Sequence, residues 1–509
     1  MKKPKFHFSH FPWYPIALST FPVLTLLAHN VGPVRLSVAA RPLLVSVCGA
    51  ALVFLLLRLA LRDWQRAAFA LTLFLLLFFS YGHVYSLLAK KWNFERLTAV
   101  MLSACLVFAV LTLWWATRKP LQFTKGVIFM NILSITMLIY PTYSVVYFSV
   151  PKWSSGNFIR DSIPLPGTKA AAVQPLPDIY YIIPDMYTRA DLLKDVYKYD
   201  NSEFLASLKQ MGFYVADCSQ SNYIRTEPSL ASSLNMNYLQ DMGADFAPDS
   251  INRFPMWRLI EHSAVRLILE SAGYKTVAFA TGFSWSEIDD ADVYLAPSPL
   301  ESEMTEFEAL LIQTTLARHL EDVGLLDAEQ IAGDRYRQRT LFVFDSFDDL
   351  ARMPGPKFVF MHIIAPHPPF VLGPHGEPLD PGSFLDEKGG YPANKFMEGY
   401  RNEVTFVNDQ LLAALERLIA ESPVPPVIVI QGDHGPWMQP KNKQFYILNA
   451  YYLPGHSDAL YAEISPVNTF RVILNSYLGA DYQLLKDVSY YSPVPNIYDF
   501  TAIPRSCGR

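Results

Sequence analysis

The sequence predicts a chain of two parts, a five-helix transmembrane bundle followed by an α/β sandwich with a mostly parallel sheet. Three observations lead to this prediction. Long apolar segments fill residues 1–150, a stretch rich in Pro and Gly follows, and short apolar runs then alternate with longer amphipathic ones. With 509 residues, 51% hydrophobic and 17% charged, the chain is too long for one ordinary soluble domain and too apolar to be disordered.

Each apolar segment is close to the ~20 residues that cross a hydrocarbon core as a helix. The expected helices lie at 13–31, 42–60, 67–88, 97–117 and 123–148. The run FLLLFF within the third segment has no polar group, which fits a helix in lipid or in the core of a bundle. Buried helices of a large soluble core are the weaker alternative.

Basic residues between the segments predict the orientation, because cytoplasmic loops keep an excess of Lys and Arg. Nine Lys and Arg residues flank the segments on the side of the N-terminus and five on the other side. With an odd number of spans, this bias places everything after residue 148 outside. We therefore expect a multi-pass protein of the plasma (inner) membrane with an extracytoplasmic or periplasmic second part. The first segment follows a basic start, but four more spans follow and no cleavage site is evident, so we expect it to be retained.

The second part begins after a linker at 151–176, which is rich in Pro, Gly, Ser and Ala and has no periodicity. This sets the expected domains at 1–150 and 177–509. Several apolar runs beyond the linker are apolar on both faces, as in a parallel sheet covered by helices, and the order of strands and helices favours an α/β sandwich. Residues 283–335 are acidic and irregular, and no place is predicted for them. The strand candidates are DIYYIIPD, GFYVA, YKTVAFAT, KFVFMHIIAP, PPVIVIQGDHG and QFYILNAYYLP, and the helix candidates are 227–240, 254–272, 336–352, 396–420 and 466–478.

Net charge and cysteines limit the partners and the chemistry. A formal net charge of -5, without a Lys/Arg run that interleaves aromatics, argues against nucleic acid as a partner. Cys48 and Cys105 lie in apolar runs, where cysteine acts as a small buried hydrophobe. Cys218 and Cys507 could form a disulfide if their domain faces an oxidising compartment, but two distant cysteines do not fix a pairing.

Polar residues follow predicted strands at their carboxyl ends, the edge where ligands bind in α/β sheets. Asp185 closes YYIIPD, His362 and His367 fall in and just after FVFMHIIAP, and Asp433 and His434 follow VIVIQG. Each has a simpler explanation, namely a helix cap for Asp185, a turn for Asp433 with His434, and a core or loop position for the other histidines. Their joint placement predicts a divalent cation bound by Asp185, Asp433 and His434.

Thr226 opens the segment TEPSLASSLN. Taken alone, it is an N-cap residue with a proline close behind it. It is also a candidate nucleophile, because orphan amides, the helix dipole and a nearby cation would favour its alkoxide. The same amides would help to hold a phosphate or sulfate group. The residues around Thr226 allow both interpretations.

Four ordered motifs, PDIYYIIPDMYTRAD, YIRTEPSLASSLN, FMHIIAPHPPF and VIVIQGDHG, resemble the signature of the sulfatase-like branch of the alkaline phosphatase superfamily. The resemblance covers most of residues 178–475, and the preceding helices are similar to the membrane parts of lipoteichoic acid synthases and lipid A phosphoethanolamine transferases. It implies an alkaline-phosphatase-like α/β sandwich. It also implies that Asp185, Thr226, Asp433 and His434 are metal ligands, with Thr226 as the attacking group.

The resemblance extends to two histidines and includes two departures. His362 and His367 repeat the H-x-x-x-x-H spacing of the phosphoethanolamine transferases, whose histidines bind the transferred phosphate and its leaving group. TEPSL aligns with the C-x-P-S-R element of sulfatases, but Thr226 replaces Cys and Leu230 replaces Arg. The formylglycine of true sulfatases therefore cannot form, which argues against sulfate-ester hydrolysis and leaves phosphoryl chemistry open. Asp185 occupies the position at which lipoteichoic acid synthases have Glu, and its shorter side chain bears on the choice of metal.

These observations predict a membrane-anchored, metal-dependent transferase. It would move a phospho-alcohol group, similar to phosphoethanolamine or phosphoglycerol, from a membrane lipid donor through Thr226 to a cell-envelope glycan or lipid acceptor. His362 or His367 would orient the phosphate or protonate the leaving group. One divalent ion is expected, and mixed oxygen and nitrogen ligands do not choose sharply among manganese, zinc, magnesium and calcium. The sequence does not fix the donor, the acceptor or the oligomeric state.

Three alternatives remain open. The first is a sulfatase-like hydrolase of sulfate or phosphate esters, and the second is a non-catalytic membrane scaffold or sensor that keeps the fold. The third is a transporter, but the apolar segments hold almost no internal ionisable residue apart from His29 and His83 near their ends, whereas conduction paths usually need them. Metal content separates the enzymes from the other two classes, and an acceptor requirement separates transfer from hydrolysis.

Overall fold

The computed structural model describes residues 11–30, 36–91, 97–118, 124–149, 175–297, 304–322, 324–325, 327–386 and 389–507. Spatial contacts divide the chain into unit 1, Met1–Pro151 with Ser302–Ala332, and unit 2, Lys152–Glu301 with Gly333–Arg509. A late segment of the sequence is thus grouped with the apolar N-terminal helices. All but the last two positions of the expected linker at 151–176 lie outside the described residues.

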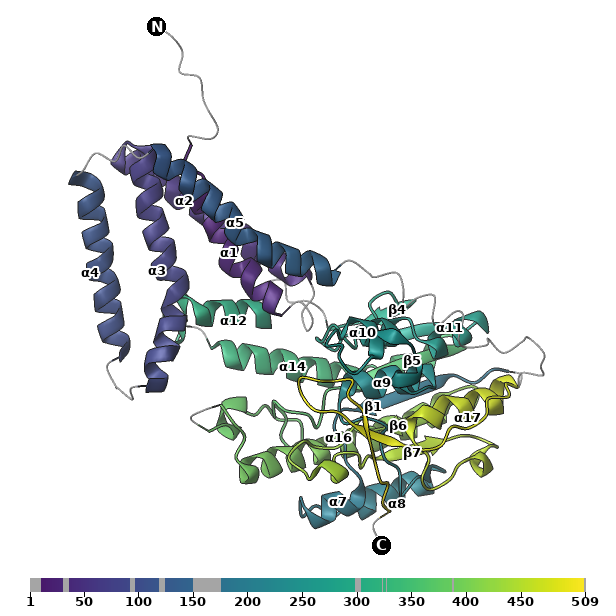
Figure 1. Ribbon diagram of the computed structural model, residues 1–509. Coiled ribbons are helices and arrows are strands. Elements are labelled where there is room, and N and C mark those ends of the chain that lie inside the picture. Colours follow the sequence, from purple (N-terminus) through teal and green to yellow (C-terminus); the bar gives the residue numbers. More distant parts are fainter. Residues whose placement is uncertain are drawn as a thin grey trace. The chain divides into compact units, whose positions relative to one another are not determined.

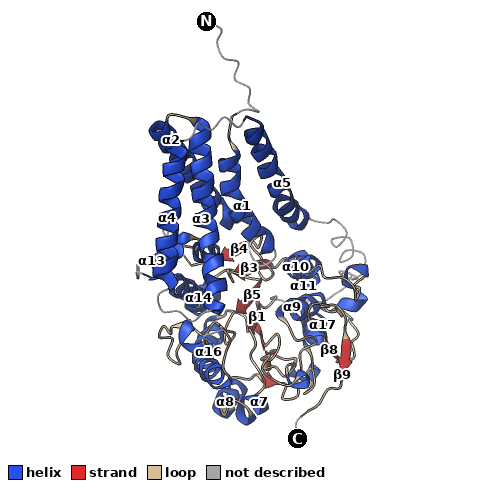
Figure 2. Cartoon of the chain, turned by 60° about the vertical axis from the view of Figure 1, so that its left-hand side comes forward, coloured by secondary structure: helices blue, strands red, loops and turns tan. Residues whose placement is uncertain are grey.

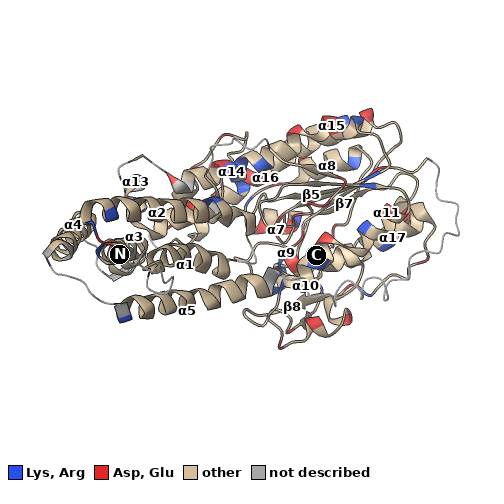
Figure 3. Ribbon diagram, turned by 90° about the horizontal axis from the view of Figure 1, so that it is seen from above, with Lys and Arg blue, Asp and Glu red and all other residues tan. Residues whose placement is uncertain are grey.

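Unit 1 consists of the apolar helices and short helices from the late segment (Figure 1). Four stretches are long and apolar enough to cross a membrane, with mean hydropathies between 1.4 and 2.5. Of the five helices expected to span a membrane, α1 is too short as described. Its 16 residues extend only about 24 Å, whereas a hydrocarbon core is about 30 Å thick. Figure 3 shows α1 free of Lys, Arg, Asp and Glu. The elements are α1 (Tyr14–His29), η2 (Leu36–Ala39), α2 (Ala40–Leu61), α3 (Trp64–Lys91), α4 (Leu97–Arg118), α5 (Thr124–Ser149), α12 (Glu306–Thr314), η5 (Leu316–Arg318) and α13 (His319–Asp322).

The late segment packs against the apolar helices of unit 1. Phe307 of α12 is buried in one cluster with Val23 and Leu27 of α1. Glu308, on the same turn, pairs with Arg41 at the start of α2. Part of the region 283–335, which had no predicted place, therefore belongs to the membrane-helix unit.

Unit 2 is built on a seven-stranded sheet with the order β2-β7-β6-β1-β5-β3-β4. The pairs β6/β1, β1/β5, β5/β3 and β3/β4 are parallel, and Ile183 of β1 is opposite His362 of β5. The sheet strands are β1 (Ile179–Pro184), β2 (Tyr214–Val215), β3 (Lys275–Phe279), β4 (Val293–Leu295), β5 (Lys357–Ile363), β6 (Val427–Gln431) and β7 (Asn449–Tyr452), and β8 (Ser489–Tyr491) pairs separately with β9 (Thr501–Ile503).

Helices cover both faces of the sheet, as Figure 2 shows with the strands lying between them. The alternation of side chains along β1 explains the two layers, since Tyr180 and Ile182 join one core cluster and Ile179, Tyr181 and Ile183 the other. The first layer holds α7 (Ala190–Asp195), α8 (Ser202–Gln210), α14 (Ala328–Asp345), α15 (Phe347–Arg352) and α16 (Ala393–Glu421), and the second holds α9 (Thr226–Asn235), α10 (Phe254–Glu261), α11 (Ala264–Ser271) and α17 (Pro466–Leu478). Short turns of 3-10 helix complete the unit, η3 (Leu239–Asp241), η4 (Ala244–Phe246), η6 (Pro381–Phe384), η7 (Lys441–Lys443) and η8 (Ser457–Ala459).

The expected mostly parallel α/β fold is confirmed, with differences at the edges of the sheet. All six strand candidates contain a strand, but β7 runs antiparallel to β6 and β2 antiparallel to β7. The apolar pattern of a strand does not reveal whether the strand runs parallel or antiparallel to its neighbour. The sequence therefore could not distinguish these strands from the parallel ones. The three-residue strand β4 and the pair β8/β9 were missed because they are short and only partly buried.

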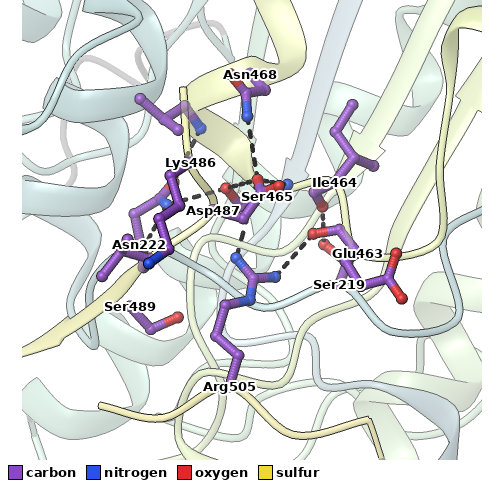
Figure 4. Close-up of polar contacts among 12 residues, drawn as sticks. Ser219, Asn222, Glu463, Ile464, Ser465, Asn468, Lys486, Asp487, Ser489 and Arg505 are labelled. Atoms are coloured by element: carbon purple, nitrogen blue, oxygen red, sulfur yellow. Dashed lines mark hydrogen bonds and ion pairs between the residues drawn. The ribbon is translucent and has the colours of Figure 1, made fainter. Parts of the chain in front are cut away.

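The C-terminal segment is tied to the loop that precedes α9 by a polar network (Figure 4). Asp487 accepts hydrogen bonds from Ser465 N at 2.9 Å and from Asn468 Nδ2 at 3.1 Å. The Arg505 guanidinium lies 3.9 Å from the same carboxylate. Asn222 Nδ2 donates to Ser465 Oγ at 3.1 Å, so the network reaches the residues just before α9.

A disulfide reinforces this connection. Cys218 and Cys507 are bonded, with Cα atoms 5.1 Å apart and a sequence separation of 289 residues. The pairing that the sequence left open is thus present. Cys48 and Cys105, in the apolar helices, are free thiols.

Replacing Cys218 and Cys507 together by alanine is expected to lower the free energy of unfolding of unit 2 by about 2–5 kcal/mol, because the cross-link restricts the unfolded chain. Denaturant unfolding of the purified full chain measures this loss. The matched control is the Cys48→Ala, Cys105→Ala variant, which keeps the cross-link. Maleimide labelling of denatured, unreduced wild type should modify two cysteines, and modification of all four would contradict the pairing.

Candidate active site

Two aspartates approach each other at the carboxyl ends of the neighbouring strands β1 and β6. Asp185 directly follows β1, and Asp433 lies two residues beyond β6. Between them, Met186 takes a left-handed conformation with φ of 64°, and its N–H donates to Asp433 Oδ1 at 2.9 Å. This conformation costs about 1–2 kcal/mol for a residue with a Cβ, so the surrounding structure must hold it in place. Gly432 permits the close approach, because a Cβ there would lie 2.4 Å from the Tyr187 carbonyl oxygen.

His434 joins these aspartates to Thr226. Its Nδ1 lies 2.8 Å from the Gly435 carbonyl oxygen, which fixes Nδ1 as a donor in the neutral ring and leaves the lone pair on Nε2. His434 Nε2 lies 3.4 Å from Thr226 Oγ1 and 3.5 Å from Asp433 Oδ2. It is 3.8 Å from Asp185 Oδ1. The structure therefore brings together all four residues expected to bind the metal.

His362 belongs to the same buried group. It lies near the end of β5, and its Nε2 is 3.4 Å from Asp185 Oδ2. Ligand atoms of Asp185, His362 and Asp433 all lie within 4.8 Å of one another. His362 is thus among the metal-binding candidates, whereas the sequence had suggested a role for it at the transferred phosphate.

The buried polar atoms of this group fit a divalent cation. Asp185 Oδ1, Asp433 Oδ2 and both ring nitrogens of His362 are buried and make no hydrogen bond to any described residue. Buried carboxylates without partners are costly unless they are paired or bind a metal. Two atoms that share one zinc ion at about 2.0–2.2 Å lie at most about 4.4 Å apart, and the separations of 3.4 to 3.8 Å satisfy this limit.

The histidines also determine the charge state of Asp185. Burial by itself raises the pKa of this carboxyl, but the neighbouring imidazoles of His367 and His362 outweigh it. His434 adds a smaller effect in the same direction, and the net result is a pKa well below the usual range. Asp185 is therefore an anion at neutral pH, as metal binding requires.

Thr226 opens onto a cavity of about 590 Å³ in unit 2. Thr226 is the first residue of α9, and Arg225 before it is extended, so the hydroxyl stands at a helix N-terminus. His367 and His434 line the cavity as well. His362 is 2% exposed and is not among its lining residues. The structure therefore separates the two histidines of the H-x-x-x-x-H motif, placing His367 at the cavity and His362 in the buried group.

His367 is held by the loop that follows β5. Its Nδ1 lies 2.6 Å from the Pro368 carbonyl oxygen, so the neutral ring donates there and turns Nε2 to other partners. The ring packs edge-on against Trp437, with centroids 5.3 Å apart. The Tyr336 hydroxyl contacts the carbonyl oxygens of Ile364 and His367. These contacts fix the ring without using its Nε2.

A buried glutamate on α16 holds the far side of this loop. Glu403 Oε1 accepts hydrogen bonds from Val371 N at 2.9 Å and Leu372 N at 3.3 Å. The side chain is fully buried. Burial raises the pKa of Glu403 well above its usual value, and the two backbone hydrogen bonds offset only part of the rise.

Sequence reasoning missed most of the cavity wall. Arg225, Arg253, Trp285, Lys441 and Tyr491 line it beside the expected residues. Arg225 could have been noted from its position next to Thr226. Tyr491 ends the short strand β8, which was missed, and the others come from turns and connections without periodicity, so no spacing in the sequence indicated them.

A model of the sulfatase family, described as "Sulfatase", matches residues 178–469, more than half of the chain. The chain therefore belongs to the sulfatase family, and it is a sulfatase-like enzyme of the alkaline phosphatase superfamily. A comparison with curated proteins gave no match.

Three solved structures illustrate the similarity. The C-terminal periplasmic domain of EcEptC from Escherichia coli has 12% identity and a TM-score of 0.41, covering 64% of this chain and 91% of that chain. The C-terminal periplasmic domain of phosphoethanolamine transferase EptC from Campylobacter jejuni has 11% identity and a TM-score of 0.38, covering 61% and 92%. The phosphonate monoester hydrolase of Agrobacterium radiobacter has 13% identity and a TM-score of 0.39, covering 62% and 80%.

Glu403→Gln is expected to flatten the pH dependence of stability. Because the folded pKa of Glu403 is raised above its ordinary value of 4.5, its contribution is fully present below that pH and is lost as pH rises through the folded pKa. Gln keeps the acceptor for the two backbone amides and does not ionise. The variant should therefore match the wild type near pH 4 and exceed it at pH 8, by about 1.4 kcal/mol for each unit of the pKa shift.

Urea unfolding from pH 4 to pH 8.5, with EDTA present so that metal binding does not contribute, measures this difference. Glu398→Gln, at an exposed position of the same helix, is the control and should follow the wild type. Parallel pH profiles for the wild type and Glu403→Gln would contradict the assignment.

Proposed function

We propose that the protein is a membrane-anchored, metal-dependent transferase that moves a phospho-alcohol group, similar to phosphoethanolamine or phosphoglycerol, from a lipid donor to an acceptor hydroxyl. The observation that carries this proposal is the position of Thr226. Its hydroxyl stands at a helix N-terminus, 3.4 Å from His434 Nε2, beside buried carboxylates with unsatisfied oxygens and at the wall of a 590 Å³ cavity. Thr226 would be the nucleophile.

Asp185, Thr226, Asp433, His434 and His362 are the residues that would hold a divalent cation. When bound, such an ion supplies a Lewis acid that stabilises charge on the transferring oxygens and favours the threonine alkoxide. The ion could be zinc, manganese, magnesium or calcium. Imidazole and carboxylate donors together are most typical of zinc and manganese.

The reaction would proceed in two displacements. In the first, Thr226 Oγ loses its proton to solvent and attacks the donor phosphorus, a bond from phosphorus to Thr226 forms, and the bond to the lipid alcohol breaks. His367, when it also carries a proton on the Nε2 that is turned away from its backbone contact, gives that proton to the leaving oxygen. In the second, the acceptor hydroxyl gives its proton to His367 Nε2 and displaces Thr226, whose oxygen regains a proton from solvent. Water in place of the acceptor would make the same site a hydrolase.

Two features support a lipid donor, and a third supports an extracytoplasmic location. Four apolar helices are long enough to cross a membrane. Unit 1 contains a cavity of about 540 Å³, lined mainly by apolar side chains such as Val53, Phe74 and Leu311, which suits an acyl chain. The Cys218–Cys507 disulfide favours an oxidising compartment for unit 2. A cell-envelope glycan or lipid is the proposed acceptor.

The nucleophile is tested by intact-mass and phosphopeptide mass spectrometry on detergent-purified protein incubated with vesicles of phosphatidylethanolamine and phosphatidylglycerol. The wild type should carry a phospho-alcohol adduct on Thr226 and about one divalent ion per chain. Thr226→Ser should still form an adduct, and Thr226→Ala should form none. Wild type with metal but no adduct would overturn the covalent mechanism, and wild type with neither would favour the scaffold alternative.

His367→Gln is expected to lower the transfer rate by about 10²–10⁴-fold when the leaving group is an alkyl alcohol, since general acid catalysis contributes about this much. With a p-nitrophenyl ester, whose leaving group needs no proton, the loss should be much smaller. The comparison requires rates for both esters with each variant. His375→Gln, at an exposed site of the same loop, is the control. Equal losses for both esters would argue against His367 as the acid.

A further inference from the structure

The cavity that Thr226 lines contains more positively charged side chains than are needed to bind the transferred phospho group alone. Besides the histidines, its charged lining residues are Arg225, Arg253, Lys441 and Glu227. None of the three cations is among the residues that gather at the buried carboxylates. They are therefore available for a different part of the ligand.

One of these cations is already neutralised. Glu227 accepts a hydrogen bond from Arg253 Nη1 at 2.9 Å and another from Trp257 Nε1 at 2.9 Å. The Glu227 side chain is 10% exposed, so its carboxylate has little further contact with solvent. Arg253 and Glu227 thus cancel, and the excess charge belongs to Arg225 and Lys441.

Arg225 and Lys441 have neutral partners. Arg225 donates to Ser492 Oγ at 3.2 Å and to the Ser492 carbonyl oxygen at 3.0 Å. Lys441 Nζ lies 4.2 Å from the centre of the Tyr491 ring. Within the described part of the chain, neither residue forms an ion pair with a carboxylate. Both are positioned by the segment around β8, so they are held at the cavity and their charges are uncompensated.

Arg225 is partly buried at the wall of the cavity, where an anion would compensate its charge. Trp285, which also lines the cavity, has a buried Nε1–H with no acceptor among the described residues and is a further potential donor.

We infer that Arg225 and Lys441 form a second anion-binding subsite, which selects a substrate with another acidic group, phosphate or carboxylate, beside the phospho group that Thr226 attacks. This inference rests on the proposed function, because it takes Thr226 as the reacting group. It adds a substrate class, since a substrate with a single phosphodiester would leave both cations unused. Two charge-assisted contacts, one at the partly buried Arg225 and one at the exposed Lys441, should together contribute about tenfold in affinity.

The test compares two ligands that differ by one acid, phenyl phosphate and 4-carboxyphenyl phosphate. Calorimetric titration uses the full-length, metal-supplemented protein in detergent with Thr226→Ala as the background, so that no turnover disturbs binding. The carboxylated ligand should bind about tenfold more tightly, and Arg225→Gln with Lys441→Gln should reduce this preference to about twofold or less. Lys443→Gln, on the same turn as Lys441 but not lining the cavity, should keep it.

Equal affinities for the two ligands, no measurable binding of either, or an unchanged preference in the double variant would each overturn the subsite. The proposed function fails separately, because it depends on the adduct on Thr226 in the otherwise native protein. A binding preference without an adduct would refute the transferase mechanism alone, and an adduct without a preference would refute the subsite alone.

The same double variant distinguishes the source of the second acid. Slower formation of the Thr226 adduct from vesicles of a lipid donor that carries two phosphates would assign the acidic group to the donor. Normal formation with slower discharge by added 4-hydroxybutyl phosphate would assign it to the acceptor. Both results support the subsite, and unchanged rates in both steps would contradict it.

Discussion

The structure of unit 2 depends on two carboxyl groups that are buried close together away from water. Asp185 and Asp433 are 4% and 3% exposed, and each has an oxygen with no hydrogen-bond partner among the described residues. Such groups cost several kcal/mol unless positive charge compensates them. His362, His367 and His434 lie close enough to lower the pKa of Asp185, and a divalent cation would supply the compensating charge. The parallel pairing of β1 with β5 and β6 makes this possible, because it ends three strands at one place.

The remainder of the unit keeps the reacting groups at fixed distances from this buried centre. Thr226 is positioned by a loop that is secured at Asn222 through hydrogen bonds and at Cys218 through the disulfide to the C-terminal segment. His367 is positioned by Trp437 and by a loop whose amides bind the buried Glu403. The restraints come from opposite ends of the sequence. A nucleophile and an acid held in this way can act on one phosphorus without a large rearrangement, which is where positioning contributes most to catalysis.

The lining of the cavity combines two kinds of residue, and this combination bears on substrate choice. Thr226 and His434 are metal-binding candidates, and Arg225 and Lys441 are cations whose partners are a serine and a tyrosine ring. Unit 1 contributes apolar helices and an apolar cavity of its own. Chain connectivity adds a second link between the units, since the segment Ser302–Ala332 leaves unit 2, packs with the apolar helices and returns. An enzyme acting on lipid would benefit from two such links, because they limit how far the catalytic unit moves from the membrane.

The sequence by itself determined that apolar helices precede an α/β domain and which residues gather at the strand ends, but not that the segment Ser302–Ala332 belongs with the apolar helices. These depend on local patterns that can be read from neighbouring residues. The patterns are apolar runs of membrane length and polar residues at or just beyond the ends of β1, β5 and β6. Only the tertiary structure decided which of the two motif histidines enters the cavity, because the turn after β5 and its contact with Trp437 set that direction. It also decided the antiparallel edge, the pairing of Cys218 with Cys507 and the cationic wall at Arg225 and Lys441. These features join residues far apart in the chain, and a residue's long-range neighbours are not encoded in its immediate sequence.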